Sequence, residues 1–268
     1  MLGGRDGEET LMRVCLLLLA IVGGCVTPDV VSQETTRDLA PSGALRAAIN
    51  FANPVLAQKS ASGEAQGVSV DLARELARRL GVPVELRAYD AAGKVFGDAK
   101  TGAWDVAFIA RDPQRANDVD FTEPYVIIEG GYLVPVNSPL RTIEDVDRQG
   151  VRIAVGRGSA YDLYLGRTLK QAQLVHAPTS PEAPFLFARD KLEAAAGVKQ
   201  QLQMYAKDHP EVRVMDGRFM LIEQAMATPR GRPLAIRYLR EFVDELKASG
   251  FVAASLAKSG QKDAAVAP

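Results

Sequence analysis

The chain has 268 residues, of which 47% are hydrophobic and 24% are charged, and its 32 Lys and Arg against 33 Asp and Glu give a net charge of −1. These ordinary values exclude intrinsic disorder, which requires low hydrophobicity and a high net charge. They also argue against a dedicated nucleic-acid-binding protein, which is normally basic. The length allows one large domain or two lobes of about 100 residues each.

The amino terminus is typical of an export signal. Val14–Val22 is an uninterrupted run of nine apolar residues, which is too short for a transmembrane helix of about 20 residues but suits a secretory signal. Acidic residues precede the run, so a start at Met12 would fit such a signal better. The run ends in Val22-Gly23-Gly24-Cys25, which resembles a bacterial lipobox; cleavage at small residues without lipidation is the alternative. We therefore expect a signal peptide with lipobox over 1–25, lipidation of Cys25, and a mature protein in the periplasm or cell envelope.

The rest of the chain alternates short apolar runs with helical patterns. Residues 26–42 are polar, with Pro near both ends, and we expect a tether there. Apolar runs predict strands over 45–50, 84–89, 106–110, 132–136, 152–156, 174–176, 192–196 and 212–215. Helical periodicity predicts helices over 70–80, 91–102, 160–170, 198–209 and 233–248. Ser69 and Gly81 are the expected caps of the first of these helices. The alternation favours an α/β fold with mainly parallel sheets, and breaks near 137 and 216 indicate two lobes.

Residues that would support enzyme or metal chemistry are scarce. The only cysteines are Cys15 and Cys25, and neither of the two histidines, His176 and His209, has a partner at metal-ligand spacing. Ser159 lacks the flanking glycines of a hydrolase nucleophile, and no phosphate-binding P-loop is present. We therefore expect no catalytic residue, no metal and no cofactor.

A glycine-containing turn, Gly156–Tyr161, follows one predicted strand and opens a helix. It matches a dinucleotide-binding fingerprint only in part, because Tyr161 replaces the third glycine. A turn of this kind still exposes backbone N–H groups and the positive end of a helix dipole, which suits a carboxylate or another small anion. An unliganded strand–helix turn is the alternative.

Four segments carry a family resemblance: Gly67–Ala73 (GVSVDLA), Gly102–Val106 (GAWDV), Arg115 with Phe121–Tyr125 (FTEPY), and Gly150–Ser159 (GVRIAVGRGS). In this order and behind an export signal, they resemble family 3 of the extracellular solute-binding proteins, the periplasmic receptors of ABC importers. The resemblance covers about 43–260. It implies a two-lobed periplasmic-binding-protein-like fold of type II, in which two α/β lobes are joined by two hinge strands. The lobes would be 43–134 plus 217–268, and 138–213, with the ligand clamped between them.

The resemblance also implies a set of ligand-binding residues. Arg115 matches the arginine that grips a ligand carboxylate, a role that suits its planar fork of N–H donors. Ser159 and the N–H groups of Ala160 and Tyr161 match anion contacts of the second lobe, and Phe51 lies where the family often places an aromatic ring. The expected ligand-binding residues are Phe51, Asn53, Ala110, Arg111, Arg115, Ser159, Ala160, Tyr161 and Lys199.

The sequence also departs from the family pattern. Ala110-Arg111-Asp112 replaces a Ser/Thr-rich run, and Asp112 before Pro113 is expected to cap a helix whose first turn contains Arg115. The acid that commonly holds a ligand's ammonium group should fall near Val198, where Lys199 follows instead. We therefore expect a small carboxylate or another acidic or polar solute rather than a standard amino acid, unless Glu223 supplies the missing acid.

The resulting prediction is a solute-binding receptor of an ABC importer that captures a small carboxylate-bearing metabolite, an amino acid or an organic acid. Its expected partners are the solute and the permease subunits of the inner membrane. We expect no nucleic acid, contact with the membrane only through the lipid anchor, and a monomer. One alternative is a periplasmic enzyme of the cyclohexadienyl dehydratase type, with Glu223 or Asp112 as its acid or base. A sensory ligand-binding module is the other.

Overall fold

The structure is a computed structural model that describes residues 31–261 and 264–268. The predicted signal peptide with Cys25 lies outside the described residues, as do the first residues of the predicted tether. Among the helices that the structure describes, none is long and apolar enough to cross a membrane.

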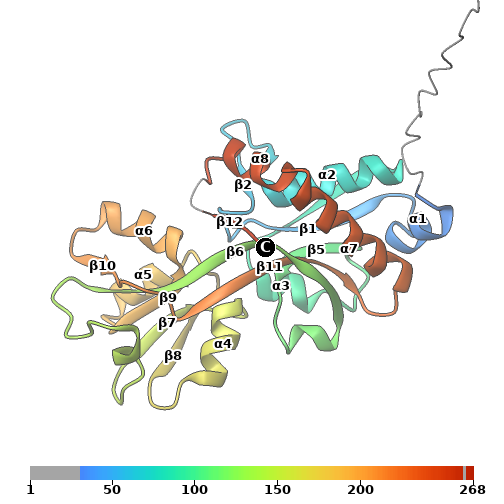
Figure 1. Ribbon diagram of the computed structural model, residues 1–268. Coiled ribbons are helices and arrows are strands. Elements are labelled where there is room, and N and C mark those ends of the chain that lie inside the picture. Colours follow the sequence, from blue (N-terminus) through green and yellow to red (C-terminus); the bar gives the residue numbers. More distant parts are fainter. Residues whose placement is uncertain (1–30, 262–263) are drawn as a thin grey trace, which may run out of the picture. The chain divides into compact units, whose positions relative to one another are not determined.

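The strands reproduce most of the predicted ones. They are β1 (Leu45–Asn50), β2 (Gln58–Lys59), β3 (Ala65–Gln66), β4 (Val84–Tyr89), β5 (Val106–Ala110), β6 (Val119–Pro135), β7 (Arg152–Gly156), β8 (Gln173–Ala177), β9 (Ala194–Val198), β10 (Val212–Val214), β11 (Met220–Pro229) and β12 (Ala265–Val266). All except the hairpin of β2 and β3 belong to one sheet with the order β4-β1-β5-β11-β6-β9-β7-β8, while β10 and β12 also pair with β6. Figure 1 shows β6 and β11 running side by side between the two ends of this sheet.

The sheet contains two groups of parallel strands, β4-β1-β5 and β8-β7-β9. Their parallel pairing is the one predicted from strand–helix alternation, and the α/β fold is confirmed. The junction between the groups is antiparallel, because β11 is antiparallel to β5 and β6, and β6 is antiparallel to β9. The prediction of a strand over 132–136 found only the end of β6 and missed β11 altogether. Both missed segments carry charged and polar residues within their runs, which hides the period of a strand.

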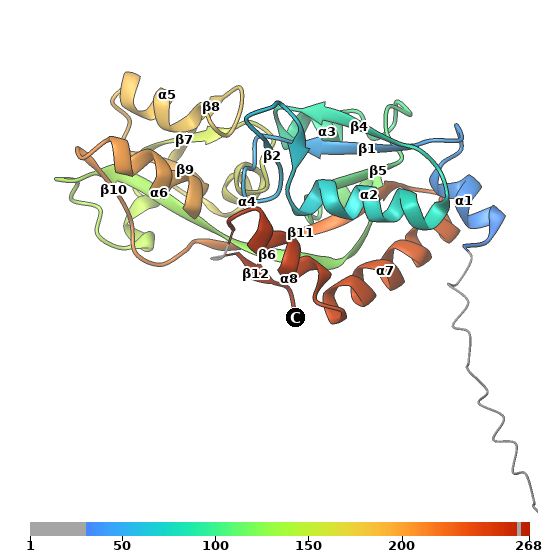
Figure 2. The same cartoon turned by 90° about the horizontal axis from the view of Figure 1, so that it is seen from above.

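The helices cover both faces of the parallel strands. They are α1 (Gln33–Leu39), α2 (Val68–Leu80), α3 (Ala92–Gly97), α4 (Ala160–Thr168), α5 (Ala183–Arg189), α6 (Lys199–Asp208), α7 (Pro233–Ala248) and α8 (Phe251–Lys258). Ala47 and Ile49 of β1 pack into the core formed with α2 and α7, whereas Ala48 between them packs with residues of α3. Figure 2 shows α2 and α7 on the same side of β1. Two-sided burial explains why β5 is apolar at all five positions.

Two local predictions need correction. The tether expected over 26–42 is wrong for 33–39, which form α1, capped by the Ser32 side chain at 3.1 Å from the Thr35 nitrogen. Leu39 is fully buried, and α1 is held by packing on α7, which its own sequence pattern could not show. Ser69 does not cap α2, because its hydroxyl lies 3.1 Å from the Tyr125 hydroxyl and Gly67 stands at the cap position. Gly81 ends α2 in the left-handed conformation, as predicted.

Candidate functional site

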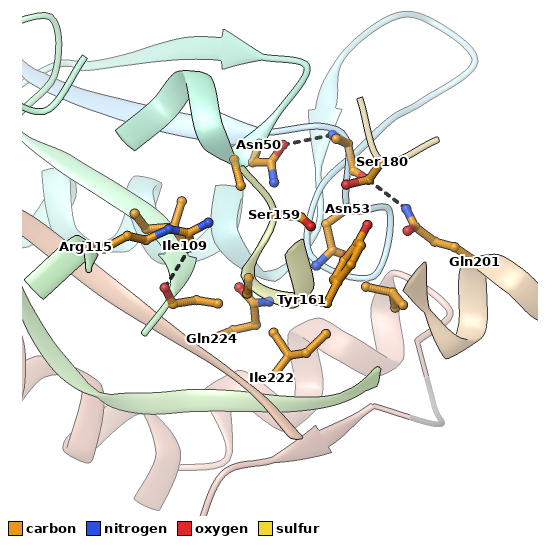
Figure 3. A pocket seen from close by; sticks show the side chains of 15 residues that line it. Asn50, Asn53, Ile109, Arg115, Ser159, Tyr161, Ser180, Gln201, Ile222 and Gln224 are labelled. Atoms are coloured by element: carbon orange, nitrogen blue, oxygen red, sulfur yellow. Dashed lines mark hydrogen bonds between the residues drawn. The ribbon is translucent and has the colours of Figure 1, made fainter. Parts of the chain in front are cut away.

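A small cavity lies where the carboxyl ends of parallel strands from both groups meet, the usual place for a ligand in α/β sheets. Its volume is about 30 Å³, which corresponds to only a few water-sized spheres. Figure 3 shows its side chains converging from β1, β5, β11 and the first turns of α4 and α6. The lining residues are Asn50, Ala52, Asn53, Ala92, Ile109, Ala110, Arg115, Ser159, Ala160, Tyr161, Ser180, Val198, Gln201, Ile222 and Gln224.

Arg115 is the only charged residue of this lining. It is fully buried, and its two terminal nitrogens donate to the carbonyl oxygens of Ala110 and Gly158, each at 2.8 Å. A guanidinium has five N–H donors, so three remain, and the buried Nε has no partner among the described residues. Burial lowers the pKa of Arg115 to about 10, against the opposing effect of the Asp112 charge, so the group is cationic at neutral pH. A buried charge without a directly bonded counter-ion is costly unless something complements it.

The short turn that carries Arg115 differs from the predicted helix. Only three residues, Arg115–Asn117, are helical, in a 3₁₀ turn, so the expected helix over this segment is wrong. Asp112 still organises the turn, because its Oδ1 accepts a hydrogen bond from the Gln114 nitrogen at 2.8 Å. The turn is too short to place Arg115 in an α-helical dipole, and the main-chain carbonyls that it contacts position its side chain instead.

The first turn of α4 forms a second wall of the cavity. The hydroxyl of Ser159, the N-cap residue, accepts from the Asp162 nitrogen at 3.1 Å, and the Asp162 carboxylate accepts from the Gly158 nitrogen at 2.7 Å. The nitrogens of Ala160 and Tyr161 have no hydrogen-bond partner among the described residues, as expected for the first residues of a helix. Backbone donors at a helix amino terminus favour an anion.

Tyr161 adds a second buried polar group without a partner. Its side chain is 3% exposed, and its hydroxyl makes no hydrogen bond within the described residues. Burial raises the pKa of this hydroxyl to about 12, so it keeps its proton at neutral pH. Native structures pair most buried polar atoms. The cavity therefore combines two unpaired polar groups, the Nε of Arg115 and the hydroxyl of Tyr161, which a bound polar solute could satisfy.

Several contacts tie the opposite walls of the cavity together. Besides the contact of Arg115 with Gly158, Gln201 donates to the carbonyl oxygen of Ala52 at 2.7 Å (Figure 3). Arg167 of α4 binds the Asp112 carboxylate at 2.7 Å. The backbones of Gly93 and Gly158 approach so closely that a Cβ on Gly158 would lie 2.7 Å from the Gly93 Cα.

The structure brings six of the nine predicted ligand-binding residues together around this cavity: Asn53, Ala110, Arg115, Ser159, Ala160 and Tyr161. The other three do not line it. Phe51 lies beneath the Lys59 ammonium, which is 5.5 Å from its ring centre, and borders a separate hollow. Arg111 binds Glu123 at 2.7 Å, and Lys199 binds Glu129 at 3.0 Å. The partners lie 12 and 70 positions away in the sequence. The sequence pattern alone therefore does not show that these two cations are paired and turned away from a ligand.

Sequence reasoning missed the neutral polar residues of the lining. Asn50 ends β1, Gln201 follows the end of β9 by one helical turn, and Gln224 lies on the unpredicted strand β11. The ends of predicted strands were a usable signal for Asn50 and Gln201, since ligands bind outside those ends. Gln224 had no such signal, because its strand was not recognised.

The acids proposed for the enzyme alternative lie outside the lining. Asp112 is bound by Arg167, and Glu223 is half exposed on β11, 3.7 Å from Arg111. None of the lining residues is Asp or Glu. Within the described part of the chain, no cluster of three or more potential metal ligands occurs.

The chain is similar to proteins of one known family. The family model for bacterial extracellular solute-binding proteins, family 3, matches residues 45–262. A search of curated proteins found no match.

Three solved structures share the fold. A solute receptor for L-cysteine from Neisseria gonorrhoeae has a TM-score of 0.73 at 23% identity, covering 84% of this chain and 92% of that chain. An amino acid ABC transporter substrate-binding protein from Streptococcus pneumoniae, bound to L-arginine, has 0.71 at 19%, covering 84% and 97%. An ancestral amino acid-binding protein, a precursor of cyclohexadienyl dehydratase, has 0.70 at 23%, covering 84% and 98%.

The family model spans most of the chain, and these structures have the same two-lobed architecture. The chain therefore belongs to family 3 of the bacterial extracellular solute-binding proteins.

Proposed function

We propose that this chain is the solute receptor of an ABC importer and that it clamps a small carboxylate-bearing solute in the cavity. The observation that carries the proposal is Arg115, a fully buried cation at the cavity whose Nε has no partner in the part of the chain that the structure describes. Its remaining donors match a carboxylate, which accepts paired hydrogen bonds from a guanidinium. The free N–H groups at the start of α4 favour the same charge. The small volume of the cavity favours a solute of few atoms.

The clamping motion follows from the sheet. We propose lobes of 43–134 plus 217–268, and 138–213, joined by β6 and β11 as hinge strands. The contacts that cross the cavity would then define the closed arrangement, and hinge bending would open it. Docking of the closed form on permease subunits, a location in the periplasm or cell envelope, and anchoring through a lipid on Cys25 complete the proposed role.

An enzymatic function is less well supported by this cavity. A dehydratase needs a general acid or base within reach of its substrate. The two acids considered for that role, Asp112 and Glu223, do not line the cavity. Burial raises the pKa of the Tyr161 phenol to about 12, far from the operating pH at which a general acid or base is most effective. The cavity is equipped to hold an anion, and we propose binding without turnover.

Isothermal titration calorimetry of the purified protein with small carboxylates tests the proposal. A carboxylate that binds the natural chain should bind Arg115→Gln at least about 100-fold more weakly, since a buried charged contact is lost. Arg111→Gln is the matched control. Arg111 follows Ala110, which lines the cavity, but its own side chain pairs with Glu123 on the surface. Thermal melts establish that both variants fold. Equal loss in both variants, or no binding of any carboxylate, would contradict the proposal.

A further inference from the structure

The charge of the cavity is unbalanced in a way that selects the solute. Among the described residues, its lining holds one cation, Arg115, and no carboxylate. The other polar side chains are neutral and comprise Asn50, Asn53, Ser159, Tyr161, Ser180, Gln201 and Gln224. A solute with one negative charge balances this lining, whereas an α-amino acid also brings an ammonium group for which the lining offers no counter-ion.

Two buried acids close in sequence to lining residues, Asp112 and Asp162, are bound by other groups. Asp112 is held by Arg167 at 2.7 Å and by the Gln114 nitrogen. Asp162 accepts from the Gly158 nitrogen at 2.7 Å and lies 2.8 Å from the His176 ring. Neither can turn to an ammonium group without giving up these contacts, and the lost partners would be left buried or half-buried.

The start of α6, which forms another wall of the cavity, also contributes no carboxylate. Val198 lines the cavity and is the N-cap residue of α6, yet its apolar side chain caps nothing. Lys199 follows it and is directed to Glu129, whose carboxylate it shares with Arg218 at 2.8 Å. This acid is therefore neutralised outside the cavity. An N-cap position usually carries Ser, Thr, Asp or Asn, so an apolar residue here leaves the N-cap without an acid, and the polar side chain that α6 does contribute to the lining, Gln201, is neutral.

We propose that the solute carries a carboxylate and no ammonium group, a deaminated or hydroxy acid in place of an amino acid, an inference that rests on the function proposed above. The carboxylate would take the free donors of Arg115 and of the first turn of α4. The hydroxyl of Tyr161 and the amide side chains would bind a neutral hydroxyl or keto oxygen at the neighbouring carbon. Such groups pair with neutral donors and acceptors, and no second charge is buried.

The test is calorimetric titration of the purified protein with pairs of small monocarboxylic acids that differ only at the second carbon: glycolate and glycine, lactate and alanine, glycerate and serine, 2-hydroxybutyrate and 2-aminobutyrate. We expect at least one hydroxy acid to bind and its amino acid to bind at least about 100-fold more weakly, since the ammonium would be buried without a partner. An amino acid that binds as tightly as its hydroxy acid would overturn the inference while leaving the receptor function intact. If none of these acids binds, the result would instead contradict the proposed function.

A pair of variants at Val198 provides the second arm. Val198→Asp places a carboxylate on the α6 wall, and we expect it to bind the favoured pair's amino acid at least about tenfold more tightly than the natural chain does. Val198→Asn is the matched control, since both side chains cap a helix equally well and only one is charged. An equal change of affinity in both variants would show that charge at this wall is not what excludes the ammonium group, and would overturn the inference.

Discussion

The contact between Gly93 and Gly158 gives a sharp test of the closing motion. Gly93 is the second residue of α3, and a Cβ at this position would lie 3.1 Å from both the Arg157 carbonyl oxygen and the Gly158 Cα. In Gly93→Ala the closed arrangement must therefore shift by a few tenths of an ångström. Overpacking of this kind costs about 1–3 kcal/mol, which corresponds to a solute affinity about 5- to 150-fold lower.

The same substitution should not harm the free protein if its lobes open. Alanine is a better helix former than glycine by up to about 1 kcal/mol, so the open form should be as stable as the natural chain or slightly more stable. Gly97→Ala is the matched control, because Gly97 ends the same helix and its Cβ would meet nothing within 4 Å.

Two measurements decide the matter: calorimetric affinity for the best-binding carboxylate, and thermal melting without solute. We expect Gly93→Ala to bind the carboxylate more weakly without a lower melting temperature. For Gly97→Ala we expect neither weaker binding nor a lower melting temperature. If Gly93→Ala lowers the melting temperature of the free protein by several degrees, the contact is permanent and the closing motion is refuted. Affinity equal to that of Gly97→Ala would refute the steric reasoning.

Two further predictions concern ion pairs. Asp112→Asn keeps an oxygen that can accept from the Gln114 nitrogen but loses the charge that binds Arg167. Because the Arg167 side chain is 35% exposed, this ion pair is partly screened by solvent. We expect solute binding about 3- to 10-fold weaker by calorimetry. Glu75 has its pKa lowered to about 2 by hydrogen bonds from Arg78 and Arg79. Its contribution to the free energy of unfolding is complete above pH 4.5, the ordinary pKa, and disappears as the pH falls through 2. Urea unfolding should therefore show Glu75→Gln less stable than the natural chain at pH 7 and equally stable near pH 2; a constant difference would contradict this assignment.

Local patterns predicted the elements whose sequence period matches their burial. The strand over 45–50 and the helix over 233–248 have the predicted bounds, because β1 is buried on both faces and α7 has one apolar stripe. The long strand β6 could not be recognised in the same way. Its first half carries a proline among polar and charged residues, and its pairing with β11 involves residues about a hundred positions away.

The site was predictable in part for a similar reason. Arg115 and Ser159 were found through segments that resemble the family, and the structure places both at the cavity. Whether a cation near the cavity is available depends on its partners, which the sequence does not show. Lys199 directly follows Val198, which lines the cavity, yet its ammonium group binds Glu129 of β6 outside the cavity.

The pairing of β6 with β11 has a consequence for kinetics. The two strands pair continuously, from the pair of Val119 with Pro229 to the pair of Gly130 with Met220. Their register shifts only near Gln224 and Ala225. On the proposed motion they must bend together as one ribbon, so opening follows a single coordinate and breaks the contacts across the cavity in one cooperative event. Differences among bound solutes should then appear as differences in residence time, since the encounter with the open form is common to them all.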